Sequence, residues 1–301
     1  MGIDGAEPYP SGVVRLIPSP LLVLLSILSV QFGAGLAKGM FDRLPPAMVV
    51  LLRLGTSAVV VGFLARRSLR TLLGDHTRRD LAIACGLGLS LALMNYSIYQ
   101  ALQTIPLGVA VTIEFLGPLL VSVLATRRFV DLLWAVLALL GVVLLSRSGG
   151  DVELTGVLWA ALGGVGWGVY ILAGSATGRR FAGNTGLALA SLVGTVAIIP
   201  MSLAQDGTTS LGHGFAQLTP ALLALGIVVG LLSSVVPYTL EMEALRRIPP
   251  RVFGILMSLE PAVAALVGMI VLSERLSAVQ WLAICSVVLA CAGATRSVRA
   301  S

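Results

Sequence analysis

Two glutamates interrupt long apolar runs and are the side chains best suited to chemistry in this sequence. Glu114 lies about eight residues into the run 106–126, roughly 12 Å from its start at 1.5 Å per residue, and Glu260 lies at a comparable depth in the run 250–273. A charge at the bilayer centre costs about 2.5–3.5 kcal/mol on insertion scales, so such a group pairs, faces a cavity or holds a proton. Desolvation favours the protonated carboxyl and a nearby cation favours the ionised one. Either glutamate therefore suits binding of a proton, of a substrate ammonium group, or of each in turn.

Arg53 gives these carboxylates a structural alternative. It lies near the middle of the apolar run 45–65 and is the one cation there. Such an arginine either neutralises an internal glutamate and fixes helix packing, or meets the carboxylate of a substrate; we favour the structural pairing, with Glu114 or Glu260 as partner. Glu260 directly precedes Pro261, so it also has an alternative role in capping or bending a broken helix.

Further polar side chains are placed to line a site between helices. Asn95 and Tyr99 are four residues apart and share a helix face, as do Tyr238 and Glu241 at a spacing of three. We expect all four to face a substrate or proton site. The alternatives are placement of tyrosines at the membrane interface, which suits Tyr99, and a solvated helix end for Glu241.

Three more residues join this candidate set, and two prolines suit bending. Gln31 lies within an apolar run among glycines, and Trp167 and Tyr170 are three residues apart on one helix face. They suit cavity lining, an interhelical hydrogen bond or ordinary packing. Pro118 and Pro261 free backbone carbonyls and bend helices, so they are candidate hinges, or they give shape without motion.

The composition excludes a water-soluble fold. Of 301 residues, 57% are hydrophobic and 11% are charged, whereas a soluble domain carries about 25% charged residues. The net charge of +6 comes from arginines in short runs between apolar stretches, which is typical of membrane topology signals rather than of a nucleic-acid-binding face. Cys85, Cys285 and Cys291 lack metal-ligand spacing, and His76 and His213 lie in predicted loops. We expect no metal, no cofactor and no nucleic-acid partner.

Ten apolar runs, separated by charged or Gly/Pro-rich breaks, have about the length of a membrane-spanning helix. The first run is too long for a signal-peptide core and no small-residue cleavage site follows it, so we expect it to be retained. The sequence therefore predicts an all-α integral membrane protein of ten transmembrane helices, with its longest loops around 66–79 and 205–218. The runs are 18–37, 45–65, 80–103, 106–126, 130–146, 154–174, 183–204, 219–241, 250–273 and 277–295.

The basic residues predict the orientation. With the N-terminus in the cytoplasm, fifteen basic residues fall on the cytoplasmic side and four fall outside. Cytoplasmic loops carry an excess of Lys and Arg. Both termini are therefore predicted to be cytoplasmic.

The two halves of the chain repeat each other. ALQTIPLGVAVTIEFLGP from Ala101 aligns without gaps to ALRRIPPRVFGILMSLEP from Ala244, with seven identities in eighteen positions that include both prolines and the Ile-Pro pair. Five spans per half give the halves opposite topology. Such an inverted repeat is typical of secondary transporters, whose substrate site lies near the midplane between the halves.

Several stretches carry a family resemblance over about residues 18–296. They are SVQFGAGLAK (29–38), the segment 94–128 that begins MNYSIYQALQ, GVLWAALGGVGWGVYIL (156–172), and the segment 236–276 that begins VPYTLEMEAL. The chain resembles the drug/metabolite transporter superfamily with two EamA-type halves, and within it the bacterial threonine/homoserine exporters. The resemblance implies a central cavity shared by both halves, alternating access and efflux driven by an ion gradient.

These observations predict a secondary exporter of small metabolites, with amino acids such as threonine and homoserine as the expected cargo. The expected partners are this small molecule, a proton or other ion gradient and the lipid bilayer of the bacterial inner membrane. A different metabolite or a toxic compound is the alternative cargo, and an intramembrane sensor or enzyme is disfavoured. We divide the chain into an N-terminal tail (1–17), a first EamA-type half (18–147), a second half (154–296) and a C-terminal tail (297–301).

Overall fold

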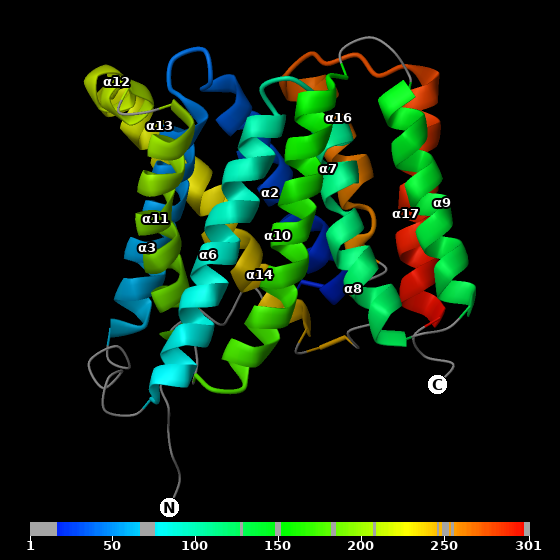
Figure 1. Ribbon diagram of the computed structural model, residues 1–301, viewed down its shortest axis with the longest axis horizontal. Helices are drawn as coiled ribbons and strands as arrows, with labels where there is room; N and C mark the ends of the chain where they lie inside the picture. The colour runs from blue at the N-terminus through cyan, green and yellow to red at the C-terminus, as the bar shows by residue number, and fades with distance from the viewer. Residues whose placement is uncertain are drawn as a thin grey trace, which may run out of the picture.

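Every regular element in the described part of the chain is a helix (Figure 1). The computed structural model describes residues 17–66, 76–126, 129–147, 152–181, 185–206, 209–245, 247–248, 253 and 256–297. The first elements are α2 (Ser19–Gly39), α3 (Pro46–Leu64), α6 (Arg78–Ala101), α7 (Leu107–Glu114), α8 (Leu116–Thr126) and α9 (Phe129–Arg147). They are followed by α10 (Leu154–Gly178), α11 (Thr185–Asp206), α12 (Thr209–Gln217), α13 (Pro220–Gly230), the π-helical turn η1 (Leu231–Val235), α14 (Val236–Leu245), α16 (Glu260–Val271) and α17 (Ala278–Ser297).

Proline and threonine set several helix starts. Pro18, Pro45 and Pro106 each occupy the N-cap position of a helix, α2, α3 and α7 respectively. Their fixed φ angle suits a helix entry, where no N–H partner is needed. Thr77 begins α6 with a capping box, because its side chain accepts from the backbone N–H of Asp80 while the Asp80 carboxylate accepts from the backbone N–H of Thr77.

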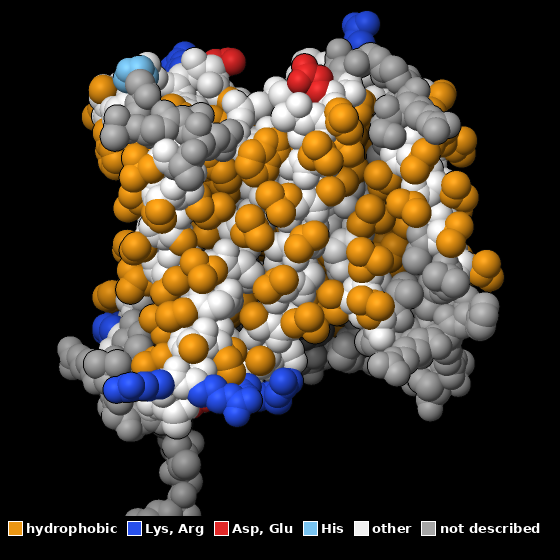
Figure 2. Space-filling model, viewed as in Figure 1, with side chains coloured by type: hydrophobic (Ala, Val, Ile, Leu, Met, Phe, Trp, Pro, Cys, Tyr) orange, Lys and Arg blue, Asp and Glu red, His pale blue; other side chains and the backbone are white. Residues whose placement is uncertain are grey.

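Within the described residues, six helices are long and apolar enough to cross a membrane. They are Ser19–Gly39, Pro46–Leu64, Arg78–Ala101, Leu154–Gly178, Thr185–Leu203 and Pro220–Glu241. Large apolar side chains are exposed on their flanks, and Figure 2 shows them as an orange band with basic side chains along the lower edge. An apolar belt of this extent suits lipid rather than water. The protein is therefore a multi-pass membrane protein.

The helices pack in pairs that are distant in sequence. α6 packs along α10 and α11, while α3 packs along α11 and α13. α2 contacts α14 and α16, and α7 contacts α16 and α10. α9 and α17 pack together at one side of the molecule (Figure 1).

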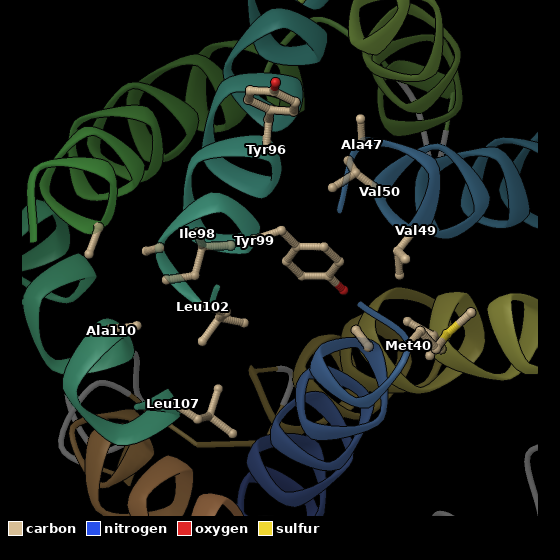
Figure 3. Close-up of a cluster of buried hydrophobic side chains, with 14 of the residues drawn as sticks. Met40, Ala47, Val49, Val50, Tyr96, Ile98, Tyr99, Leu102, Leu107 and Ala110 are labelled. Atoms are coloured by element: carbon tan, nitrogen blue, oxygen red, sulfur yellow. The ribbon is translucent and has the colours of Figure 1, made fainter. Parts of the chain in front are cut away.

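The largest buried hydrophobic cluster lies where α2 and α6 end and α3 and α7 begin. Tyr99, fully buried, reaches from α6 toward Val49 of α3 and Met40 at the end of α2 (Figure 3). Leu102 and Leu107 extend the same cluster toward α7. This end of the molecule is therefore closed by packed side chains.

The structure departs from the predicted segments at three places. The run 106–126 is not one helix, because it breaks at Phe115 between α7 and α8. In the run 250–273, α16 begins only at Glu260, and residues 249–252 and 254–255 lie outside the described part. Residues 209–217 form α12 within the predicted loop 205–218, so His213 lies in a helix rather than in a loop. Of the predicted loop 66–79, residues 67–75 lie outside the described part.

Candidate functional site

Glu114 is the last residue of α7 and is held against a glycine surface. Pro118, four residues later, has no N–H to donate to the Glu114 carbonyl, and the helix ends there. A Cβ atom at Gly163 of α10 would lie 3.2 Å from Glu114 Oε1, and one at Gly164 would lie 2.8 Å from the Glu114 carbonyl oxygen. The buried carboxylate makes no hydrogen bond or ion pair with any described residue. The carboxylate of this buried residue can therefore still accept hydrogen bonds from a ligand.

α2 contacts two other acidic side chains of this region, the buried Glu260 and the partly buried Glu241. Gln31 Nε2 donates to Glu260 Oε1 at 2.9 Å, and Ser26 Oγ donates to Glu241 Oε1 at 2.5 Å. Gln31 is 2% exposed and Glu260 is 6% exposed. In the described part of the chain, Gln31 Oε1 and Glu260 Oε2 have no hydrogen-bond partner. The helix α2 thus contacts both acidic side chains. In the Gln31–Glu260 pair, one oxygen of each side chain remains without a hydrogen-bond donor.

Arg53 of α3 binds the π-helical turn η1. Its Nη2 donates to the Ser233 carbonyl at 3.0 Å, and its Nε lies 3.5 Å from Ser234 Oγ. The Ser233 carbonyl lies four residues before Pro237, which has no N–H to donate to a carbonyl four or five residues earlier. The carbonyl five residues before it belongs to Leu232 and accepts from Ser29 Oγ at 2.7 Å. Arg53 and Ser29 donate to these two carbonyls, in the turn where Pro237 leaves one helical N–H missing.

Arg53 also contacts Tyr99, and it forms no ion pair with a glutamate. Its Nη1 donates to the Tyr99 hydroxyl at 3.4 Å, and the guanidinium lies 5.7 Å from the Tyr99 ring centroid. No Arg53–carboxylate ion pair occurs among the described residues, so the expected direct pairing with Glu114 or Glu260 is wrong. Both carboxylates nevertheless lie within electrostatic reach of Arg53. The arginine acts on them through space, and its hydrogen bonds go to η1 and Tyr99.

The remaining predicted residues lie in several different surroundings. Asn95 is buried on α6, where its Nδ2 donates to the Leu91 carbonyl of the same helix at 2.8 Å. Trp167 stacks edge-on against Phe115, with ring centroids 5.1 Å apart, in a cluster with Phe115 and residues of α9 and α17. Tyr170 packs instead in a cluster between α6 and α11. The two aromatic rings of α10 thus have different neighbours, and the Tyr238 side chain lies outside the described residues.

The two hinge candidates lie at helix interruptions of different kinds. Pro118 is in the first turn of α8, just after the break at Phe115. Pro261 is in the first turn of α16, which begins at Glu260 without a side-chain cap. Each proline therefore follows a glutamate at a helix end or start.

Lys38 and Glu274 form an ion pair that the sequence analysis did not single out. Lys38 Nζ lies 2.7 Å from Glu274 Oε1 and also donates to the Ile105 carbonyl at 2.8 Å. Glu274 Oε2 accepts from the backbone N–H of Leu107 at 2.9 Å, at the start of α7. A carboxylate is favourable at a helix N-terminus. The pair ties the end of α2 to the start of α7 and to the segment after α16.

Two sequence signals could have found part of what was missed. Pro237 follows the serines 233 and 234, and a proline at that spacing predicts free carbonyls that need donors. Lys38 is the only lysine in the sequence, and it lies at the end of an apolar run. No comparable signal exists for Ser26, since serines are common in membrane helices.

The comparisons with known proteins agree with this all-helical membrane fold. Residues 154–296 match the EamA-like transporter family. The threonine/homoserine exporter RhtA of Salmonella typhimurium LT2 is 41% identical over 296 residues, which cover 96% of each chain. RhtA of Escherichia coli K12 is 39% identical with the same coverage. A solved structure titled "Crystal structure of protein" matches 94% of this chain and 98% of its own, with a TM-score of 0.58 at 20% identity, and supports the fold alone.

The relatives align along nearly the whole chain, so the similarity includes the segments that carry Gln31, Arg53, Glu114 and Glu260. They are transporters and not enzymes, in agreement with the expectation from the sequence. The chain belongs to the EamA-like transporter family of the drug/metabolite transporter superfamily, in its threonine/homoserine exporter subgroup.

Proposed function

We propose that this protein exports threonine and homoserine from the bacterial cytoplasm by alternating access driven by an ion gradient. The names of the relatives supply the cargo, and the buried polar groups between α2, α3, α7 and η1 suit it. An amino acid at neutral pH carries an ammonium and a carboxylate, so a site for it needs an anion and hydrogen-bond donors. Glu114 supplies the anion. Arg53 and Tyr99 are the donors within reach of the same region.

The single observation that carries this proposal is the unpartnered carboxylate of Glu114. A buried acid without a hydrogen-bond donor is unfavourable in the empty protein. A substrate ammonium group supplies both the charge and the three donors that it lacks. α10 packs closely against Glu114 at Gly163 and Gly164, because glycine has no side chain to keep the two helices apart, and this contact fixes the position of the carboxylate. Glu114 is therefore proposed as the contact to the substrate ammonium.

We further propose a ten-helix inverted repeat, and the packing pairs support it. The first half would comprise α2, α3, α6, α7–α8 and α9, and the second α10, α11, α13–η1–α14, α16 and α17. The contact of α2 with α14 then corresponds to that of α10 with α6, and the contact of α2 with α16 to that of α10 with α7. The pairs α3–α11, α7–α16 and α9–α17 each join equivalent helices. A twofold relation between the halves would give this pattern, which supports our proposal of a site between them around a shared central cavity.

The proposed location is the inner membrane with both termini in the cytoplasm. Exposed arginines cluster at the start of α6 and the end of α10, along the lower edge of Figure 2; these are Arg78, Arg79, Arg179 and Arg180. An excess of arginine is typical of the cytoplasmic face. The opposite end, which carries the Lys38–Glu274 pair and the packed cluster around Tyr99, would face outward. The two halves would then rock about Pro118 and Pro261 to open it.

Efflux from cells preloaded with labelled threonine or homoserine tests the proposal. We expect this chain to accelerate efflux at least about tenfold over cells without it, and a protonophore to abolish the gain. Glu114→Gln should lose transport because it removes the charge that binds the ammonium group. Glu153→Gln is the matched control, since Glu153 is an exposed acid at the start of α10.

Membrane abundance of each variant is measured in the same cells, so that a loss of protein is not read as a loss of transport. Unchanged efflux of both amino acids with wild-type protein in the membrane would overturn the cargo assignment and direct the search to other metabolites. Full transport by Glu114→Gln would overturn the role of that carboxylate.

A further inference from the structure

The contact between Gln31 and Glu260 has one hydrogen bond, whereas an amide and a carboxylic acid can form two. An amide and a carboxylic acid side by side form two parallel hydrogen bonds, one donated by the amide N–H and one by the acid O–H. The first is present, from Gln31 Nε2 to Glu260 Oε1. The atoms that would make the second, Gln31 Oε1 and Glu260 Oε2, are both buried and both lack a partner among the described residues. Both atoms are acceptors while Glu260 is ionised, so a single proton on Oε2 would satisfy the two at once.

The charged groups around Glu260 also favour its protonated form. Three charged groups lie within its electrostatic reach: Glu241 on α14, Glu114 on α7 and Arg53 on α3. Three ionised glutamates with one arginine leave two uncompensated negative charges, and Glu114 and Glu260 are buried while Glu241 and Arg53 are partly buried. Such an excess is costly at low dielectric, and neutralisation by protons relieves it.

The three glutamates differ in what they already bind. Glu114 makes no hydrogen bond with any described residue and is left open to a substrate. Glu241 accepts from the Ser26 hydroxyl, which serves the ionised and the protonated acid alike. Only Glu260 lies beside a buried acceptor, Gln31 Oε1, that a carboxylic acid O–H would satisfy and that an ionised carboxylate leaves unsatisfied.

We propose that Glu260 and Gln31 form the site that binds the coupling proton, separate from the substrate carboxylate Glu114. This inference rests on the proposed exporter function. A proton that enters from the side of higher proton concentration binds Glu260 Oε2, the carboxylate becomes neutral, and its O–H donates to Gln31 Oε1. Release of that proton on the other side returns the charge to Glu260 and breaks the second hydrogen bond.

The location of the pair couples the proton to helix movement. Gln31 lies on α2 and Glu260 begins α16, so the doubly bonded pair fastens these two helices together. α2 also holds α14 through Ser26 and η1 through Ser29. Protonation of Glu260 therefore strengthens, and deprotonation weakens, the contact between α2 and α16, and α2 also contacts α14 and η1.

The substitution Glu260→Gln tests the proposal without removing the pairing partner. Two amides can form the same pair of hydrogen bonds, so the variant imitates the protonated state and is expected to fold. In proteoliposomes we expect it to lose accumulation of labelled threonine against its gradient, driven by a pH difference, by at least about tenfold. Exchange of internal for external threonine at equal pH should continue, with a rate that no longer depends on pH. Glu114→Gln should lose both modes.

Two outcomes with active wild-type protein would overturn the assignment. Uphill accumulation by Glu260→Gln at the wild-type rate would show that the coupling proton binds elsewhere. Loss of exchange together with accumulation would place Glu260 in substrate binding or in the fold rather than in proton binding.

A measurement without cargo separates this proposal from the exporter function. Infrared difference spectra of the purified protein in bilayers, recorded between acidic and alkaline pH, report carboxylic acid C=O bands. We expect a band that disappears in Glu260→Gln and shifts in Gln31→Met, which removes both hydrogen bonds to the acid while keeping the side chain's length. Wild-type protein that transports neither amino acid but shows this band would overturn the cargo and support the proton site. A spectrum unchanged by Glu260→Gln would overturn the proton site whatever the cargo.

Discussion

Glu274 and Glu114 are the same residue type in opposite circumstances. Both oxygens of Glu274 are occupied, Oε1 by the Lys38 ammonium and Oε2 by the Leu107 N–H. Glu114 is buried and makes no hydrogen bond with any described residue, and Glu260 has a partner on one oxygen only. Glu274, at one end of the helix bundle, therefore has a donor for each of its oxygens. Glu114 and Glu260, between the helix ends, have oxygens without a donor.

The difference separates structural from functional acids. A buried acceptor without a donor costs free energy, so it persists where a ligand or a proton supplies the missing partner during function. The Lys38–Glu274 pair needs no such partner, and it fastens α2, α7 and the segment after α16. Substitutions should therefore affect transport most among the incompletely satisfied groups and least at Lys38 and Glu274.

After the substitutions of Glu114 and Glu260, the largest effect is expected from Arg53→Lys. Arg53 donates to the Ser233 carbonyl and to the Tyr99 hydroxyl from different nitrogens, and a lysine ammonium cannot reproduce this planar arrangement. Transport should fall to below about one-tenth of wild type although the positive charge is kept, since the π-helical turn loses its support. Threonine efflux per unit of membrane protein measures this, with Arg275→Lys on an exposed residue as control. Wild-type efflux by Arg53→Lys would show that charge alone suffices.

Much of the fold could be predicted because apolar length and arginine distribution are local properties of the sequence. Each predicted run overlaps an observed helix, from 18–37 at α2 to 277–295 at α17. The break at Phe115 was missed because a proline predicts a bend without giving its position relative to the neighbouring helices. The helix α12 was missed because its short segment is less apolar than a membrane span.

The contacts of the candidate site were less accessible to sequence reasoning. Glu114, Glu260, Gln31 and Arg53 stand out because they are polar residues in apolar runs. Their partners do not stand out, since partner choice depends on which faces of distant helices meet. Gln31 and Glu260 are 229 residues apart. We expected Arg53 to pair with a glutamate because opposite charges attract. Arg53 donates instead to the Ser233 carbonyl, in the turn where Pro237 supplies no N–H.

An intermediate effect is expected from Gly163→Ala, which tests whether Glu114 binds the substrate. The added Cβ would lie 3.2 Å from Glu114 Oε1, which is a tight contact, so it should displace the carboxylate proposed to bind the substrate ammonium. We expect the concentration of threonine needed for half-maximal transport to rise about tenfold, with the amount of membrane protein unchanged. Gly174→Ala on the same helix is the matched control, since its Cβ would meet Leu87 at an ordinary 3.8 Å. Equal behaviour of the two variants would contradict a substrate site beside Gly163.

The smallest effect is expected from Lys38→Met, which removes the ion pair between Lys38 and Glu274. Glu274 keeps its hydrogen bond from the Leu107 N–H, and the pair is partly exposed, with 21% and 12% of the side chains accessible. Exposed or partly exposed ion pairs contribute about 0.2–1 kcal/mol, so transport should fall by no more than about threefold. Efflux by Lys38→Met is compared with Arg275→Met, which removes a neighbouring exposed charge. A loss as large as that of Arg53→Lys would mean that the closure held by Lys38 and Glu274 is itself a step of the transport cycle. The distinction between structural and functional carboxylates would then no longer separate the two regions.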